Sequence, residues 1–209
     1  MSITSGALYI LSAPSGAGKT SLVKALLAQD KQVCVSVSHT TRMIRGGETE
    51  GIDYNFVTSE AFNQLLQQGQ MLEHASVFGN SYGTSRQWVD LALEQGKDVI
   101  LEIDWQGRDQ VLTIFPQAVA VTILPPSRAA LQARLEGRGT DSQAIIGQRM
   151  AEAHSEISHY SGSHYLVVND DFQQAVADLQ CIFTCRRLKT TQQAHNHHQL
   201  LLELLSTGG

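Results

Sequence analysis

Short apolar runs alternate with longer amphipathic segments along most of the chain. The apolar runs are rich in Val, Ile and Leu and are bounded by turn or polar residues, a pattern that favours strands covered on both faces of a sheet. We therefore predict strands over residues 7–12, 33–37, 98–103, 118–124 and 165–168.

The segments between these runs repeat their apolar positions at helical spacing. The last of them shows the period most clearly, because one stripe carries Phe172, Val176, Leu179, Ile182 and Phe183. Strands that alternate with helices predict an α/β fold built on a mostly parallel sheet flanked by helices. The predicted helices cover residues 18–29, 107–114, 127–136, 142–158 and 171–189.

Residues 38–90 break the alternation. They contain arginines, glycines and tyrosines, a short β-like piece at 54–57, and little helical pattern beyond 60–68. We interpret this region as an inserted lobe.

Two further segments lie outside the regular pattern. Residues 137–142 separate two predicted helices and indicate a mobile turn, and the tail is polar as far as Leu200, where a leucine-rich segment predicts a short helix. The expected division is a core of residues 1–37 and 91–189, a lobe of residues 38–90 and a C-terminal tail of residues 190–209.

Composition narrows the class of protein. The chain has 209 residues, of which 42% are hydrophobic, so it can bury the core of one domain. Its net charge of −5 gives no general affinity for nucleic acid or anionic lipid. No apolar run approaches the roughly 18 residues that cross a bilayer, and no secretory signal is evident at the start. Three cysteines without metal-ligand spacing favour a reducing cytoplasm.

The strongest chemical signal follows the first predicted strand. It matches the phosphate-binding P-loop pattern, except that Ala13 stands where the strict pattern has glycine. Glycines allow the backbone to approach phosphate oxygens, and the following helix directs its N–H groups and its dipole at the anion. Lys19 can reach the β- and γ-phosphates, and the Thr20 hydroxyl can bind Mg²⁺. The loop consists of Ala13, Pro14, Ser15, Gly16, Ala17, Gly18, Lys19 and Thr20.

A second anion site is suggested by two arginines in the inserted lobe. Arg42 and Arg45 lie close together on a glycine-containing loop, where two guanidinium groups suit a second phosphate. Tyr54 and Tyr82 could add phenolic donors. Spacing alone leaves open a solvated loop with incidental arginines.

Five motifs, at residues 12–20, 36–42, 79–84, 103–107 and 135–140, occur in the order found in guanylate kinases. From about residue 7 to residue 189, the chain resembles the bacterial members of that family. The resemblance implies a P-loop kinase core, an inserted GMP-binding lobe and a lid at about residues 134–149. It also implies transfer of the ATP γ-phosphoryl group to GMP, giving ADP and GDP in purine nucleotide metabolism, with Mg²⁺.

The resemblance also implies roles for individual residues. The ATP side would comprise the P-loop and Asn169, with Lys19, Arg42 and three arginines of the lid region as catalytic residues: Arg134, Arg138 and Arg149. The GMP phosphate would be held by Arg42, Arg45, Tyr54 and Tyr82, and the guanine by Ser38, Glu73, Thr84 and Asp104. Thr20 would bind the metal directly. Glu102 stands where many relatives carry Asp, so we assign it a role through water.

The residues assigned to the base suit guanine chemically. Carboxylates such as Glu73 and Asp104 accept hydrogen bonds from guanine N1–H and its 2-amino group, while the hydroxyls of Ser38 or Thr84 can donate to O6. Adenine would leave a carboxylate facing a lone pair, and such sites can discriminate by ~10⁴ or more.

Two other functions stay open at this stage. The chain could be a catalytically inactive guanylate-kinase-like module that binds proteins, although retention of Lys19, Thr20 and the arginines argues against a scaffold. It could also phosphorylate another acceptor, such as AMP, UMP or a ribose phosphate. His195, His197 and His198 in the tail are better interpreted as solvated residues than as metal ligands. The expected partners are ATP and GMP, with no nucleic acid or membrane, and a homo-oligomer stays open.

Overall fold

The central sheet has five strands, all parallel, in the order β2-β7-β1-β8-β9. The computed structural model describes residues 6–77, 79–137 and 142–206. The predicted α/β fold on a mostly parallel sheet is confirmed, and each predicted strand is present within two residues of its expected ends. The strands are β1 (Leu8–Ser12), β2 (Val33–Val35), β7 (Asp98–Glu102), β8 (Val119–Leu124) and β9 (Tyr165–Val168).

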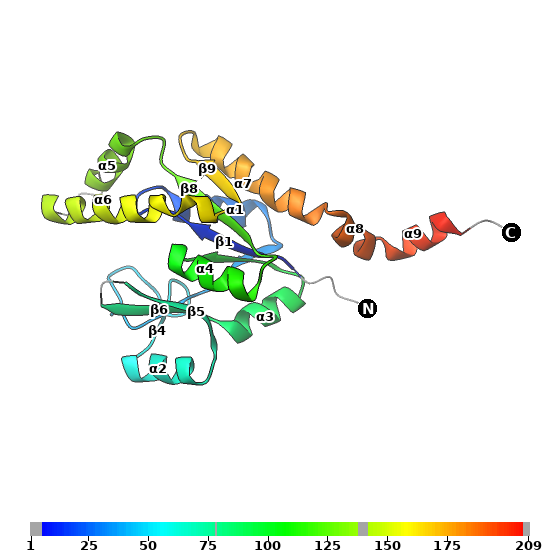
Figure 1. Cartoon of the computed structure of the whole chain (residues 1–209), viewed down its shortest axis with the longest axis horizontal. Coiled ribbons are helices and arrows are strands. Elements are labelled where there is room, and N and C mark those ends of the chain that lie inside the picture. Colours follow the sequence, from blue (N-terminus) through cyan, green and yellow to red (C-terminus); the bar gives the residue numbers. More distant parts are fainter. Residues whose placement is uncertain (1–5, 78, 138–141, 207–209) are drawn as a thin grey trace.

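Helices cover both faces of this sheet, as Figure 1 shows. One hydrophobic cluster joins the sheet to α1 (Lys19–Gln29) and α7 (Phe172–Arg187), and a second joins it to α3 (Arg86–Glu94) and α4 (Trp105–Ile114). Four members of the predicted α7 stripe are buried, but Phe172 is 37% exposed because it stands at the first position of the helix.

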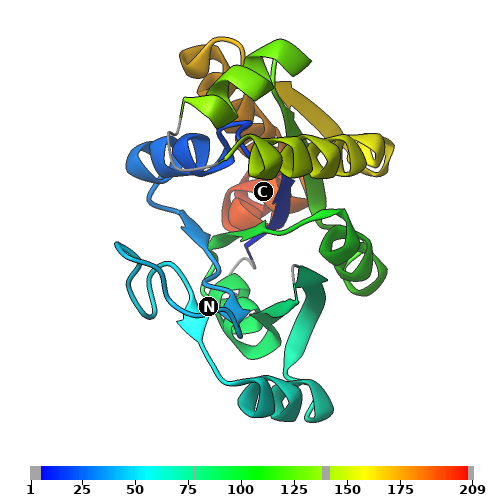
Figure 2. The ribbon, with the colours of Figure 1, turned by 90° about the vertical axis from the view of Figure 1, so that its left-hand side faces the viewer.

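A second sheet, with four strands in the order β4-β3-β6-β5, carries the residues of the inserted region. It lies below the five-stranded sheet in Figure 2, with α2 (Ser59–Gln67) at its far end. Its strands are β3 (His39–Thr40), β4 (Asn55–Phe56), β5 (Met71–Val77) and β6 (Asn80–Ser85).

The expectation of little helix in residues 38–90 beyond 60–68 was wrong, because α3 begins at Arg86. The Ser85 hydroxyl caps this helix by accepting a hydrogen bond from Trp88 N, at 3.4 Å. The long strands β5 and β6 were also not predicted, because their polar residues hide the two-residue period.

The lid predicted at about residues 134–149 falls on the end of α5 (Arg128–Glu136) and the first part of α6 (Gln143–Ser158), and α6 is followed by a short 3₁₀ turn (Tyr160–Gly162). The two helices share a small apolar cluster of their own, formed by Leu131, Leu135, Ile146 and Ala153. Most of the predicted turn between them, including Arg138, lies outside the described residues.

The C-terminal tail is helical over most of its length, including the polar part where no helix was predicted. It forms α8 (Thr190–Asn196) and α9 (His198–Leu205), which project from the body in Figure 1. In the part of the chain that the structure describes, no helix is long and apolar enough to span a membrane.

Candidate active site

The phosphate-binding loop connects the end of β1 to the start of α1. Gly16 and Gly18 have φ angles of 93° and 95°, the left-handed region that disfavours a side chain. Neighbouring groups close off the same positions, because a Cβ on Gly18 would collide with the Asn169 amide and one on Gly16 would lie 3.0 Å from a methyl group of Leu131. The sequence therefore needs glycine here for both backbone conformation and packing.

Two side chains support this loop from behind. The Ala17 carbonyl accepts hydrogen bonds from Asn169 Nδ2 at 2.7 Å and from Arg134 Nη1 at 3.4 Å. Arg134 also donates from Nη2 to the Asn169 carbonyl, at 2.9 Å. Asn169 is buried, at 5% exposure. In this structure both residues hold the loop in shape and do not line its open side.

Lys19 and Glu102 meet where two neighbouring strands end. Strands β1 and β7 are parallel and adjacent, so their carboxyl ends open onto the same edge of the sheet. The Lys19 Nζ lies 3.8 Å from a Glu102 carboxylate oxygen, and both side chains are about one fifth to one quarter exposed, at 21% and 24%. Thr20 lines the same cleft.

The side chains at this edge could bind a divalent cation only if a bound nucleotide supplied further oxygen ligands. Thr20 offers a hydroxyl and Glu102 a carboxylate, both oxygen donors of the kind that Mg²⁺ prefers. Within the described residues, no cluster of three or more His, Cys, Asp or Glu side chains could hold a metal ion. This donor set therefore suits a cation that arrives with nucleotide phosphates.

Glu73 is a buried acid that lines the same cleft from the second sheet. It lies on β5 with 4% exposure, and the Thr84 hydroxyl on β6 donates to its Oε1 at 2.6 Å. Burial raises the pKa of Glu73 to about 7, and the negative charge of Asp104 adds to the effect, while the Thr84 hydrogen bond opposes it. A Cβ on Gly107 would lie 2.7 Å from Glu73 Oε2, so a larger residue there would displace the Glu73 carboxylate.

Asp104 caps α4 and faces the same cleft. Its Oδ1 accepts a hydrogen bond from Gly107 N at 3.0 Å, which places the carboxylate at the positive end of the helix. Because Gly107 also borders Glu73, the first turn of α4 holds the two carboxylates near each other.

The two arginines of the inserted loop differ in their surroundings. Arg45 lines the cleft together with Tyr54 and Tyr82, whose rings meet edge to face at 5.9 Å. Arg42 lies over the Tyr54 ring, at 5.2 Å, and forms a two-point ion pair with Glu48. Arg42 is thus beside the cleft and is already bound to an acid.

The cleft has a volume of about 570 Å³ and brings most of the predicted residues together. Ala17, Arg42, Thr84, Arg134 and Asn169 lie behind or beside its walls, and Arg138 is outside the described residues. The predicted residues that line it are Ala13, Pro14, Ser15, Gly16, Gly18, Lys19, Thr20, Ser38, Arg45, Tyr54, Glu73, Tyr82, Glu102, Asp104 and Arg149.

Several residues of the site were not predicted. Ser21, Ala75, Val77 and Ile103 line the cleft without a distinctive sequence pattern, and so does Glu152. Glu152 follows Arg149 by three residues on α6, so helical spacing from a predicted lid arginine could have indicated it. Glu48 was also missed, because an ion pair within an irregular loop has no spacing rule.

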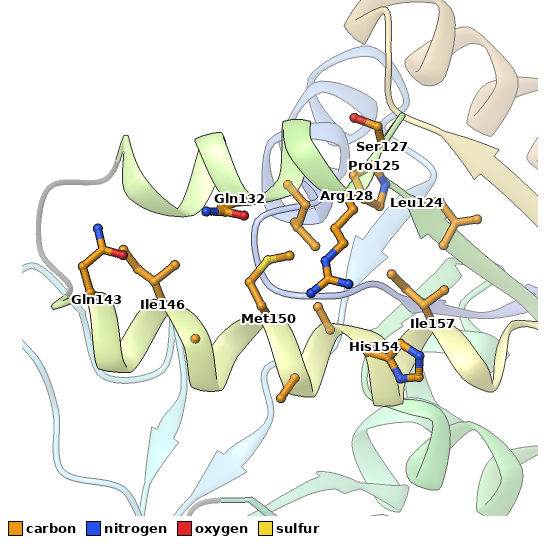
Figure 3. A pocket seen from close by; sticks show the side chains of 14 residues that line it. Leu124, Pro125, Ser127, Arg128, Gln132, Gln143, Ile146, Met150, His154 and Ile157 are labelled. Atoms are coloured by element: carbon orange, nitrogen blue, oxygen red, sulfur yellow. The ribbon is translucent and has the colours of Figure 1, made fainter.

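A larger cavity, of about 730 Å³, lies between α5 and α6. Figure 3 shows it lined by mainly apolar side chains such as Leu124, Ile146, Met150 and Ile157, with Arg128 reaching across it. It contains none of the predicted site residues. Size alone would therefore have pointed to the wrong place, and the charged cleft is the better candidate.

Known proteins match this chain over almost its whole length. A family model described as guanylate kinase matches residues 5–185. The chain is 54% identical to a guanylate kinase of Saccharophagus degradans over 96% of its own length and 98% of that protein. It is 56% identical to one of Alkalilimnicola ehrlichii, with 96% and 98% coverage. A crystal structure of guanylate kinase from Anaplasma phagocytophilum matches with a TM-score of 0.74 at 33% identity, covering 90% of each chain. The chain belongs to the guanylate kinase family.

Proposed function

We propose that this chain transfers the γ-phosphoryl group of ATP to GMP, giving ADP and GDP for purine nucleotide metabolism. The observation that carries the proposal is the pairing of two chemistries in one cleft. A phosphate loop with Lys19 and the buried acid Glu73 with Asp104 line the same cleft. A triphosphate and a guanine base are the ligands that these two groups of residues suit.

In this proposal, the protein positions two anions and neutralises their charge. The P-loop backbone and Lys19 hold the ATP phosphates, while Arg42, Arg45, Tyr54 and Tyr82 hold the GMP phosphate. Arg149, which lines the cleft from α6, balances charge on the transferred group, with Arg134 and Arg138 as the other proposed arginines. The GMP phosphate is itself the nucleophile, so no side chain has to remove a proton.

Mg²⁺ is the proposed metal, held by Thr20 directly and by Glu102 through water. When bound, it would offset phosphate charge and help to align the ATP tail. The proposed compartment is the cytoplasm, where Cys34, Cys181 and Cys185, free in the structure, would stay reduced.

The proposal is tested by offering several acceptors with ATP and measuring ADP release in a coupled assay. GMP should be used with the highest kcat/KM among GMP, AMP, UMP and ribose 5-phosphate. If AMP or UMP were preferred, the assignment of Glu73 and Asp104 to guanine would be wrong. If no acceptor gave turnover, the chain would instead be a binding module.

The pH dependence of GMP binding follows from the pKa of Glu73. Guanine N1–H and its amino group need an ionised acceptor, but with a pKa of about 7 only about one tenth of Glu73 is ionised near pH 6. The dissociation constant for GMP should therefore fall about tenfold between roughly pH 6 and pH 8 and then level off.

Calorimetric titration at several pH values measures this dependence. The GMP phosphate also titrates, with a second pKa of about 6, so the reference is Glu73→Gln, which keeps the phosphate titration and removes that of Glu73. Identical pH profiles for both proteins would contradict the assignment of Glu73.

A further inference from the structure

The loop that carries Arg42 and Arg45 has little apolar packing to order it. It spans residues 41–54 between β3 and β4. Its large apolar side chains point outward, with Met43 86%, Ile44 52% and Ile52 71% exposed. A loop of this kind must take a defined shape from polar contacts, since apolar burial contributes little.

Glu48 makes three such contacts with the two arginines. Its Oε2 accepts from Arg42 Nη1 at 3.0 Å, and its Oε1 accepts from Arg42 Nη2 at 2.7 Å. Its Oε2 also accepts from the backbone N–H of Arg45, at 2.8 Å. The paired side chains are only 10% and 21% exposed for Arg42 and Glu48. One carboxylate thus fixes the side chain of one arginine and the backbone of the other.

This contact leaves Arg42 with donors for a second anion. Met43 O takes a further Nη1 donor, at 2.8 Å. A guanidinium has five N–H donors, so the remaining ones belong to Nε and Nη2, which form the other edge at which arginine binds an oxyanion. The Tyr82 hydroxyl, a proposed phosphate ligand, lies close enough to this guanidinium to raise the pKa of Arg42.

We propose that Glu48 is a positioning residue that holds Arg42 and Arg45 in the arrangement needed to bind the acceptor phosphate. This rests on the proposed assignment of these arginines to GMP. Glu48 itself does not touch the nucleotide; it stays with Arg42 while the other edge of the guanidinium binds phosphate. The mutual attraction lowers the pKa of Glu48 and raises that of Arg42, so both groups stay charged at neutral pH.

Removing the Glu48 carboxylate should change GMP affinity in opposite directions, depending on whether Glu48 positions Arg42 or competes with the phosphate for it. If Glu48 competed with phosphate for Arg42, removing its charge would tighten GMP binding. If Glu48 positions the arginines, Glu48→Ala should weaken GMP binding about tenfold, measured both as Kd by calorimetry and as KM, because a charge-assisted contact that orders the site is lost. Glu48→Gln, which keeps an accepting oxygen, should recover part of the affinity. The KM for ATP should change less than about twofold.

Two controls make the result specific to the phosphate. Glu50→Ala removes the same charge from the same loop, but Glu50 accepts from the backbone N–H of Phe56 and forms no ion pair with an arginine among the described residues, so GMP affinity should hold or rise slightly. Guanosine, which has no phosphate, should inhibit wild type and Glu48→Ala equally. The inference is overturned if Glu48→Ala leaves the Kd for GMP unchanged or lowers it. It is also overturned if inhibition by guanosine weakens as much as GMP binding does.

Arg42→Ala separates the inference from its premise. If Arg42→Ala weakens GMP binding and Glu48→Ala does not, only the role of Glu48 fails. If neither variant affects GMP binding although the wild type phosphorylates GMP, both the role of Glu48 and the assignment of Arg42 to the phosphate are wrong. Thermal denaturation of each variant verifies that the protein is folded.

Discussion

Replacing Lys19 with alanine should lower kcat on the order of 10³-fold or more, because the transferred phosphoryl group loses the cation that the P-loop holds against it. The side chain lies at the mouth of the loop, 3.8 Å from Glu102, and is only partly covered, so its removal should leave the core intact. Initial rates with saturating ATP and GMP measure the loss.

The matched control is Lys24→Ala, which removes the same charge from an exposed position on the same helix. It should retain nearly full activity. Far-ultraviolet circular dichroism and the thermal midpoint should be the same for both variants within a few degrees. Near-normal turnover of a folded Lys19→Ala protein would contradict the catalytic role of the lysine.

Glu73→Gln should lower kcat/KM for GMP on the order of 10²-fold while the KM for ATP stays nearly constant. The glutamine amide has only one accepting oxygen. Its NH₂ group would face guanine N1–H and the 2-amino group, which are also donors. Because the original carboxylate is buried, water cannot easily replace the lost acceptor. Steady-state kinetics with each substrate varied in turn measure both constants.

Stability separates loss of recognition from loss of folding. The pKa of Glu73 is about 7 in the folded protein, above its ordinary value of 4.5. The folded state therefore binds the Glu73 proton more tightly than the unfolded state. The stabilisation that results is fully present below about pH 4.5 and is lost as the pH rises through about 7. Above that pH, glutamine avoids a buried charge, so Glu73→Gln should be no less stable than wild type near pH 8.

Glu60→Gln, at an exposed position on α2, is the control for the kinetic prediction. Equal losses for ATP and GMP would refute selective base recognition.

The parts of the molecule that were predicted are those with local signals. Apolar runs mark the five strands of the central sheet because both faces of each strand are buried. The P-loop is equally local, since the glycines and Lys19 act within eight residues of one another. The family motifs then indicated residues such as Glu73, whose environment on a polar strand gave no independent signal.

The rest depends on contacts between distant or irregular segments. Asn169 bonds to Ala17 across 152 positions, and no periodicity predicts such a pairing. Strands β5 and β6 were missed because Glu73 and Thr84 are polar residues on buried faces, where the bond between them replaces apolar packing. Glu48 and Arg42 pair only because their loop folds back on itself.

The two hydrogen bonds to the Ala17 carbonyl bear on the entropy of nucleotide binding. Because Asn169 and Arg134 hydrogen-bond the P-loop to neighbouring segments, the loop is held in shape without a bound nucleotide. The entropy lost on docking the donor should then come mainly from the nucleotide itself, since the receiving backbone has little freedom left to lose.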